Sequence, residues 1–311
     1  MITRKEFYFK SSNGYSDIYS AIWLDENKKQ YKGIIQLVHG MSEHILKYEN
    51  FACFMASNGF IVCGNDHIGH GRSVKNKDEF GYFGEGKYNY VKLVKDIRRL
   101  NLKIKKMYPY LSITLIGHSM GSFLARDYTY RYPNSIDRSI FIGTSGNNPL
   151  LLGGLKMCDF KIKTGKGKER GYFVNKLAFG SYNSKYKNVK TEFDWICSDE
   201  NVVKKSMEDD KFGFIFTYAG YYDLFRVLKT VSSNKWYKGL DKRIPILLMA
   251  GKDDPVGNYG KGVTEVYKKL IKQNIDTEII LYNGMRHEIL NEKNKIKVYN
   301  DILNWIYKKY K

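Results

Sequence analysis

The sequence predicts an α/β fold in which a mostly parallel central sheet is flanked by helices and an inserted cap interrupts the alternation. Short β-branched runs alternate with amphipathic stretches along most of the 311 residues, which is typical of a parallel sheet covered by helices. The runs are nearly continuous in apolar residues, as in strands that are buried on both faces. One long stretch lacks this rhythm, which indicates an insertion into a single large domain.

Eight strands are expected in chain order. The first two, Glu6–Lys10 and Ser16–Trp23, alternate in polarity on either side of Ser-Asn-Gly-Tyr and predict an antiparallel hairpin. Six further strands are predicted from apolar runs: Ile34–Val38, Phe60–Cys63, Ile113–Ile116, Ile140–Ile142, Ile246–Met249 and Ile279–Leu281.

Three helical patterns lie between or after these strands. The clearest runs from Tyr90 to Met107, with apolar residues on one face and Lys and Arg on the other, and ends before Pro109. A second runs from Ser119 to Tyr132 and stops at Pro133, and a third, from about Ile296 to Tyr310, closes the chain.

The stretch without alternation is residues 147–236, which we expect to form a cap (lid) inserted between two strands of the core. The core then comprises residues 1–146 and 237–311. An aromatic run at Phe212–Phe225 fits either packing inside the cap or a wall that binds an acyl chain. Together with Leu150–Leu152, it alternatively forms a lid face that docks on lipid.

Composition excludes several protein classes. No apolar run approaches the roughly 18–20 residues of a membrane-spanning helix, and the N-terminus has no apolar signal region, so we expect a cytoplasmic protein. The four cysteines are widely spaced, without CxxC pairs, and predict buried, reduced thiols rather than disulfides or a zinc site. They are Cys53, Cys63, Cys158 and Cys197.

The net charge of +20 is spread along the chain rather than gathered in one block. Richness in Lys, Asn, Ile and Tyr suits an AT-rich genome, and this is the simplest interpretation. The alternative is loose peripheral attraction to an anionic membrane. No nucleic-acid-binding motif is present, so no nucleic-acid partner is expected.

The segment Gly117-His118-Ser119-Met120-Gly121 fits G-x-S-x-G between a predicted strand and a predicted helix. A serine on such a sharp turn has an exposed hydroxyl, and the flanking glycines leave room for the strained backbone. The helix N-terminus next to it favours developing negative charge. Ser119 is therefore the candidate nucleophile.

A serine hydroxyl needs a base to accept its proton and an acid to orient that base. His287 follows the strand at Ile279–Leu281 and is the candidate base. Asp254 follows the strand at Ile246–Met249 and is the candidate acid, while the adjacent Asp253 is a competing choice. Both loops leave the carboxyl ends of predicted strands, where open α/β sheets place their sites.

Two backbone N–H groups are needed to bind the oxyanion that forms during acyl transfer. Met120, directly after the nucleophile, is one candidate donor, and Met41, in the loop after Ile34–Val38, is the other. No metal or organic cofactor is expected. We interpret His67 and His70 as residues that brace a loop, and the Gly-Lys-Gly segments at 165–167 and 260–262 as ordinary turns.

Taken together, these segments resemble the α/β-hydrolase superfamily, and within it the monoacylglycerol lipase and lysophospholipase branch, also called the serine aminopeptidase S33 group. The similarity covers the whole chain. It is carried by His39-Gly40-Met41-Ser42-Glu43-His44, Asn65-Asp66-His67-Ile68-Gly69-His70-Gly71-Arg72-Ser73, the serine turn, Gly-Lys-Asp-Asp-Pro-Val and Arg-His-Glu-Ile-Leu-Asn-Glu. The acid of this branch lies three residues after the strand-end glycine, which supports Asp254. Relatives often carry Arg-Tyr where this chain has Lys47-Tyr48.

The resemblance implies a serine hydrolase that cleaves carboxylic esters of lipids, such as monoacylglycerols or lysophospholipids, under a cap that admits an acyl chain. The partner is then a lipid or other acyl ester, and the oligomeric state stays open between monomer and dimer. A thioesterase, a small-ester esterase or a peptidase is the alternative within the same mechanism. A catalytically silent binding protein is a further alternative, although such proteins usually lack at least one of the three candidate catalytic residues.

Overall fold

The computed structural model describes residues 1–147 and 150–309 and contains an eight-stranded sheet with the order β1-β2-β4-β3-β5-β6-β7-β8. β1 and β2 form the expected antiparallel hairpin, β2 is antiparallel to β4, and the other pairs are parallel. All eight expected strands are present, with bounds that differ by a few residues. They are β1 Ile2–Lys10, β2 Asp17–Asp25, β3 Gly33–Val38, β4 Phe60–Asn65, β5 Ile113–His118, β6 Arg138–Ile142, β7 Ile246–Gly251 and β8 Thr277–Tyr282.

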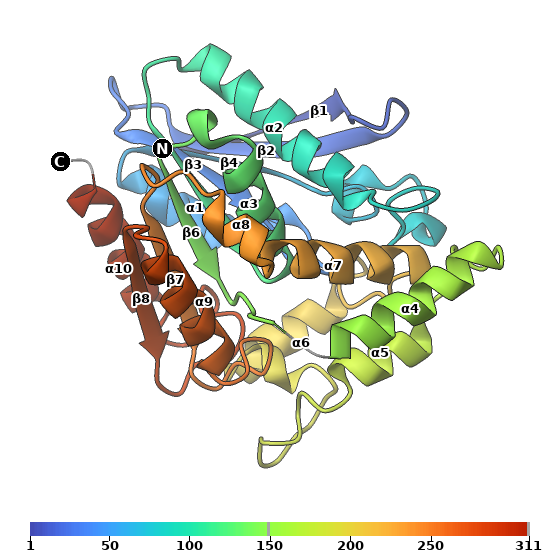
Figure 1. Cartoon of the computed structure of the whole chain (residues 1–311). Helices are drawn as coiled ribbons and strands as arrows, with labels where there is room; N and C mark the ends of the chain where they lie inside the picture. The colour runs from blue at the N-terminus through green and yellow to red at the C-terminus, as the bar shows by residue number, and fades with distance from the viewer. Residues whose placement is uncertain (148–149, 310–311) are drawn as a thin grey trace.

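Helices cover both faces of the sheet. Because successive side chains of a strand point to opposite faces, each buried strand contributes to two separate hydrophobic clusters. In β3, Ile34 and Val38 pack in one cluster and Ile35 and Leu37 in the other. The first cluster joins α2, α3 and α9, and the second joins α1 and α10 (Figure 1). The bounds are α1 Glu49–Ser57, α2 Tyr90–Met107, α3 Met120–Arg131, α9 Lys261–Lys272 and α10 Lys295–Lys308. α2, α3 and α10 correspond to the three predicted helices, whereas α1 and α9 were not expected.

Helices dominate the segment between β6 and β7. They are α4 Leu150–Lys163, α5 Tyr172–Phe179, α6 Glu200–Glu208, α7 Tyr218–Val231 and α8 Asn234–Lys238, with a 3-10 turn at Asp194–Ile196. Figure 1 shows α4, α5 and α6 beyond the end of the sheet toward which β6 and β8 point. α7 lies between these helices and the sheet, in contact with both α3 and α4. The expected lid residues Leu150–Leu152 lie outside the described side chains.

The aromatic run divides between the two roles expected for it. Phe216 and Tyr221 are fully buried in the cluster that also contains α2 and α3. Phe212 and Phe214, by contrast, line a cavity, and Phe225 belongs to both the cluster and the cavity wall. Packing therefore accounts for one part of the run and a cavity wall for the other.

Arg126 of α3 holds the two points at which the chain leaves the sheet for the inserted segment and returns from it. Its guanidinium is fully buried and donates to the carbonyl oxygens of Ser145, at 2.9 Å, and Val231, at 2.7 Å. It also lies over the ring of Trp236, with its central carbon 4.6 Å from the ring centroid. One side chain thus ties the outgoing strand, the end of α7 and α8 to a helix of the core.

No disulfide joins the cysteines, all of which are free. Cys63, Cys158 and Cys197 are buried as expected, and burial raises the pKa of the Cys158 thiol to about 12. The expectation of burial is wrong for Cys53, which is partly exposed on α1.

Candidate active site

Ser119 occupies a strained turn between β5 and α3. Its φ of 54° and ψ of −125° are unfavourable for a residue with a side chain, and strain of this kind is found at functional sites. The turn requires both flanking glycines: a Cβ on Gly117 would collide with the backbone of Gly121, and a Cβ on Gly121 would collide with the carbonyls of Val38 and His39. The serine N–H donates to the carbonyl of Ile142 at 2.9 Å, which fixes the turn to β6.

Asp254 and His287, which lie 33 residues apart in the sequence, meet at the ends of β7 and β8. His287 Nδ1 is 3.0 Å from Asp254 Oδ2, and both side chains are buried. The other carboxylate oxygen, Oδ1, accepts the N–H of Val256 at 2.8 Å, so the carboxylate orientation is fixed from both sides. The competing Asp253 is exposed and has no such contact with the imidazole.

Gly143 leaves room for the imidazole of His287 because it has no side chain. It follows β6 with φ of 58°, and a Cβ there would lie 2.9 Å from His287 Cε1 and 3.1 Å from Nδ1. Sequence reasoning did not identify this glycine, because its neighbours in the fold come from two distant loops.

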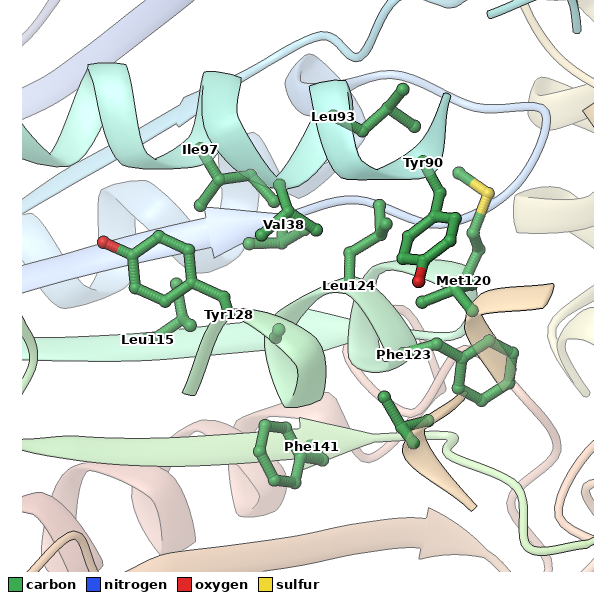
Figure 2. Close-up of a cluster of buried hydrophobic side chains, with 14 of the residues drawn as sticks. Val38, Tyr90, Leu93, Ile97, Leu115, Met120, Phe123, Leu124, Tyr128 and Phe141 are labelled. Atoms are coloured by element: carbon green, nitrogen blue, oxygen red, sulfur yellow. The ribbon is translucent and has the colours of Figure 1, made fainter. Parts of the chain in front are cut away.

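Met41 and Met120 both line the cavity described below, as does Ser119. Met120 is the first residue of α3, where a helix leaves N–H groups without partners inside the helix. Its side chain lies in the buried cluster with Tyr90 and Phe123 (Figure 2). In the other loop the N–H of Gly40 is donated to Glu43 Oε1, which leaves the next N–H, that of Met41, as the candidate donor.

A cavity of about 550 Å³ connects Ser119 and His287 with the inserted segment. This size is within the range of small-molecule sites in proteins. Its lining includes apolar side chains of α3, α5 and α7, namely Phe123, Val174, Leu177, Leu224, Phe225 and Leu228. Trp195, also of the inserted segment, lies with its ring centroid 5.2 Å from that of His287.

A buried charged network lies beside the candidate triad. Tyr48 donates its hydroxyl proton to Glu43, and its oxygen is 2.8 Å from His118 Nδ1. His118 Nε2 faces the carbonyl of His287 at 3.3 Å. Burial lowers the pKa of His118, but the hydrogen bond and negative charge of Glu43 outweigh this effect and raise it. Burial likewise opposes ionisation of Glu43, but its hydrogen bond with His118 and the charge of Lys47 hold its pKa well below the usual range. Sequence reasoning raised Glu43 only as a motif residue and as a candidate ion-pair partner of Lys47.

The three histidines near β3 and β4 brace the loops that follow these strands. His39 donates from Nδ1 to the carbonyl of Gly40 at 2.9 Å, and its Nε2 accepts the N–H of His67 at 3.0 Å. Burial lowers the pKa of His67 to about 4 and that of His70 to about 3, so these rings are neutral. Within residues 1–147 and 150–309, no group of three metal-ligating side chains is arranged to hold an ion.

The inserted segment is fixed to both candidate catalytic loops. The N–H of Glu288 donates to the carbonyl of Ile196 at 2.7 Å, beside His287. On the other side, Ser42 donates to the carbonyl of Phe214 at 2.6 Å and accepts, through its own carbonyl, the N–H of Gly213 at 2.9 Å. No sequence signal points to these contacts, because the residues are separated by about 90 to 170 positions.

Comparison with known proteins identifies relatives along most of the chain. The Hydrolase_4 family, described as serine aminopeptidase S33, matches residues 29–294. A monoglyceride lipase homologue of Monkeypox virus is 26% identical over 90% of this chain and 91% of its own. A monoacylglycerol lipase of Mycolicibacterium smegmatis is 25% identical over 98% of this chain and 97% of its own.

Solved structures agree with this assignment. A carboxyl esterase from Bacillus coagulans superimposes with a TM-score of 0.92 and 29% identity, covering 98% of both chains. The expected α/β-hydrolase fold is therefore confirmed, with its eight-stranded, mostly parallel sheet. The chain belongs to the serine aminopeptidase S33 family of α/β-hydrolases and is a serine hydrolase of that fold.

Proposed function

We propose that this protein cleaves carboxylic esters of lipids, with monoacylglycerols or lysophospholipids as substrates, through an acyl-enzyme on Ser119. The observation that carries this proposal is the cavity, which is lined by the candidate nucleophile and by apolar side chains and is large enough for an acyl chain. The lipase and esterase relatives support the same substrate class.

In the proposed reaction, Ser119 Oγ attacks the ester carbonyl carbon while His287 Nε2 accepts the hydroxyl proton. Asp254 holds the imidazole at Nδ1 and stabilises its charged form. The N–H groups of Met41 and Met120 bind the oxyanion, and the loss of one such donor typically costs about 10²–10³-fold in kcat. The imidazolium then protonates the leaving alcohol, and water repeats the sequence on the acyl-enzyme.

We propose that residues 147–236 act as the cap and that α5 and α7 set the acyl length that the cavity accepts. Val174 and Leu177 of α5 and Leu224 and Leu228 of α7 line the same cavity. Because these side chains belong to none of the loops that carry the candidate catalytic groups, we expect their exchange to change chain-length preference without altering the chemistry.

An ester substrate fits the charges at the cavity better than a peptide with a free amino terminus. Recognition of an α-ammonium group requires an unpaired carboxylate near the nucleophile. Glu43 and Glu288, the two buried carboxylates that line the cavity, both already pair with Lys47. Glu192, which also lines it, is exposed to solvent, where pairing with an ammonium group contributes little free energy of binding.

The deciding experiment incubates the purified protein with a fluorophosphonate probe and a panel of esters from acetyl to long-chain monoacylglycerol. We expect labelling that disappears in Ser119→Ala, and higher kcat/KM for long monoacyl esters. Labelling with activity on short esters, thioesters or peptides alone would overturn the lipid substrate. A folded protein without labelling would overturn the acyl-enzyme mechanism.

We further propose that α5 and its surroundings contact an anionic lipid surface. Tyr172 and Phe173 are 68% and 60% exposed, and Leu177, which also lines the cavity, is 45% exposed. Lysines surround these side chains in the sequence at positions 161, 163, 166, 168 and 176. Apolar residues next to cations are typical of helices that lie in a membrane interface. No described helix is long and apolar enough to cross the bilayer.

Sedimentation with phosphatidylglycerol and phosphatidylcholine vesicles tests this contact. We expect binding to the anionic vesicles that Phe173→Ser combined with Leu177→Ser reduces at least five-fold, while activity on a short soluble ester persists. Tyr110→Ser is the control, because Tyr110 is 97% exposed and lies before the amino end of β5, whereas the inserted segment follows the carboxyl end of the parallel strand β6. Equal binding of all three proteins, or equal binding to both lipids, would contradict the proposal.

A further inference from the structure

Lys47 links the two loops that carry the candidate catalytic groups. Its ammonium pairs with Glu288, directly after His287, and lies 3.7 Å from Glu43, in the loop of Met41. The exposed fractions of the three side chains are 13%, 4% and 4%, so little water reaches the ions. A lysine between two buried carboxylates on separate loops fixes the distance between those loops.

The charge balance of the site depends on this lysine. Burial lowers the pKa of Lys47, but Glu288 and Glu43 outweigh that effect and raise it above its usual value, so the lysine remains charged. Two carboxylates face it, and the other titratable side chain close to Glu43 is that of His118, whose Nδ1 is 3.5 Å from the carboxylate. Without Lys47, one buried carboxylate loses its partner, which is costly in a region of low dielectric constant.

The same lysine touches the inserted segment. Its Nζ lies 4.1 Å from the ring centroid of Phe212, an attractive arrangement between a cation and an aromatic face. Two residues further on, Phe214 accepts the hydrogen bond of Ser42. The ammonium therefore contacts the loop of Met41, the loop of His287 and the inserted segment at one point.

We propose that Lys47 is a positioning residue that, through Glu288 and Glu43, holds His287 at a fixed distance from the loop of Met41. This inference rests on the proposed hydrolytic function. Lys47 itself does not contact the substrate; it acts by keeping the base and the oxyanion donors at a fixed separation. Catalysis of this kind is sensitive to displacements well below 1 Å, roughly 10²-fold in rate for a full ångström.

Kinetics of variants on a short soluble ester, p-nitrophenyl butyrate, test the proposal. We expect Lys47→Met to lower kcat by about ten-fold or more with KM within three-fold of wild type, and Lys47→Arg to restore most of kcat. Glu288→Gln is expected to lower kcat as well. The double variant Lys47→Met/Glu288→Gln is then expected to lose less than the product of the two single losses, since both act through one contact.

Lys297→Met is the matched control, because Lys297 also pairs with a carboxylate, that of Asp301 at 3.2 Å, but is 66% exposed. Retention of kcat in Lys47→Met, or independent effects of the two substitutions, would overturn the positioning role. If Lys47→Met does not fold, Glu288→Gln decides: an unchanged kcat overturns the proposal. A wild-type protein that is neither labelled by fluorophosphonate nor active would refute the proposed function itself, which is a different outcome.

Discussion

Gly143 offers a test of the candidate site at a residue that takes no part in the chemistry. Replacement by alanine introduces a Cβ 2.9 Å from His287 Cε1, inside ordinary van der Waals contact, which begins at about 3.4 Å. The neighbouring backbone is held by the hydrogen bond from Gly143 N–H to Met249, at 2.9 Å. The imidazole ring must therefore move, and it moves relative to both Ser119 and Asp254.

The size of the effect follows from that distance. Relieving the contact requires a displacement of about 0.5 Å, and since about 1 Å of misplacement costs on the order of 10²-fold, we expect kcat to fall by roughly ten-fold. Alanine at a φ of 58° also loses about 1–2 kcal/mol of stability through its strained backbone.

Gly284→Ala separates these two effects. Gly284 has a similar φ, 72°, and lies in the loop before His287, but no atom is within 4 Å of the position of its Cβ. We expect both variants to lose similar stability in urea denaturation, while only Gly143→Ala loses kcat on p-nitrophenyl butyrate. Wild-type kcat in Gly143→Ala, or the same kinetic loss in Gly284→Ala, would refute the reasoning.

Three further predictions concern single residues. Ser119→Ala is expected to abolish fluorophosphonate labelling with unchanged circular dichroism, whereas Met120→Leu retains kcat because the candidate oxyanion donor is its backbone N–H, which leucine also supplies; similar losses would contradict this. Asp254→Asn is expected to lower kcat by about 10⁴-fold and Asp253→Asn hardly at all, and the reverse order would transfer the acid role to Asp253. Burial, only partly offset by the amides of Asn89 and Tyr90, raises the pKa of Asp223 to about 7. Its ionised form is therefore disfavoured in the folded state, and Asp223→Asn is expected to raise the free energy of unfolding at pH 8. Because the folded carboxyl takes up its proton below pH 7, this gain shrinks toward pH 4, and a pH-independent difference would contradict the assignment.

The strands were predictable because burial on both faces leaves a simple record in the sequence. β3 and β7 consist almost entirely of apolar residues, and each ends directly before a candidate functional loop. The turn at Ser119 was predictable for a related reason, since two glycines separated by three residues meet a steric need that is local to the chain.

The helices of the inserted segment were harder to predict because their apolar residues serve three environments. In α5, Val174 is buried and lines the cavity, Leu177 lines it but is exposed, and Phe173 faces solvent, so no single stripe repeats along the helix. The charged network left still less signal. Lys47 and Glu288 are 241 positions apart, and only the folded chain brings them together.

The hydrogen bonds of Arg126 have a consequence for which substitutions the chain can accept during evolution. Its two shortest hydrogen bonds go to main-chain carbonyls, those of Ser145 and Val231, which any amino acid supplies equally well. Substitutions at Ser145 and Val231 that keep the path of the main chain therefore leave the attachment of the segment to α3 in place. The side chains at these two positions can vary in the course of evolution while the joint between the inserted segment and the core is retained.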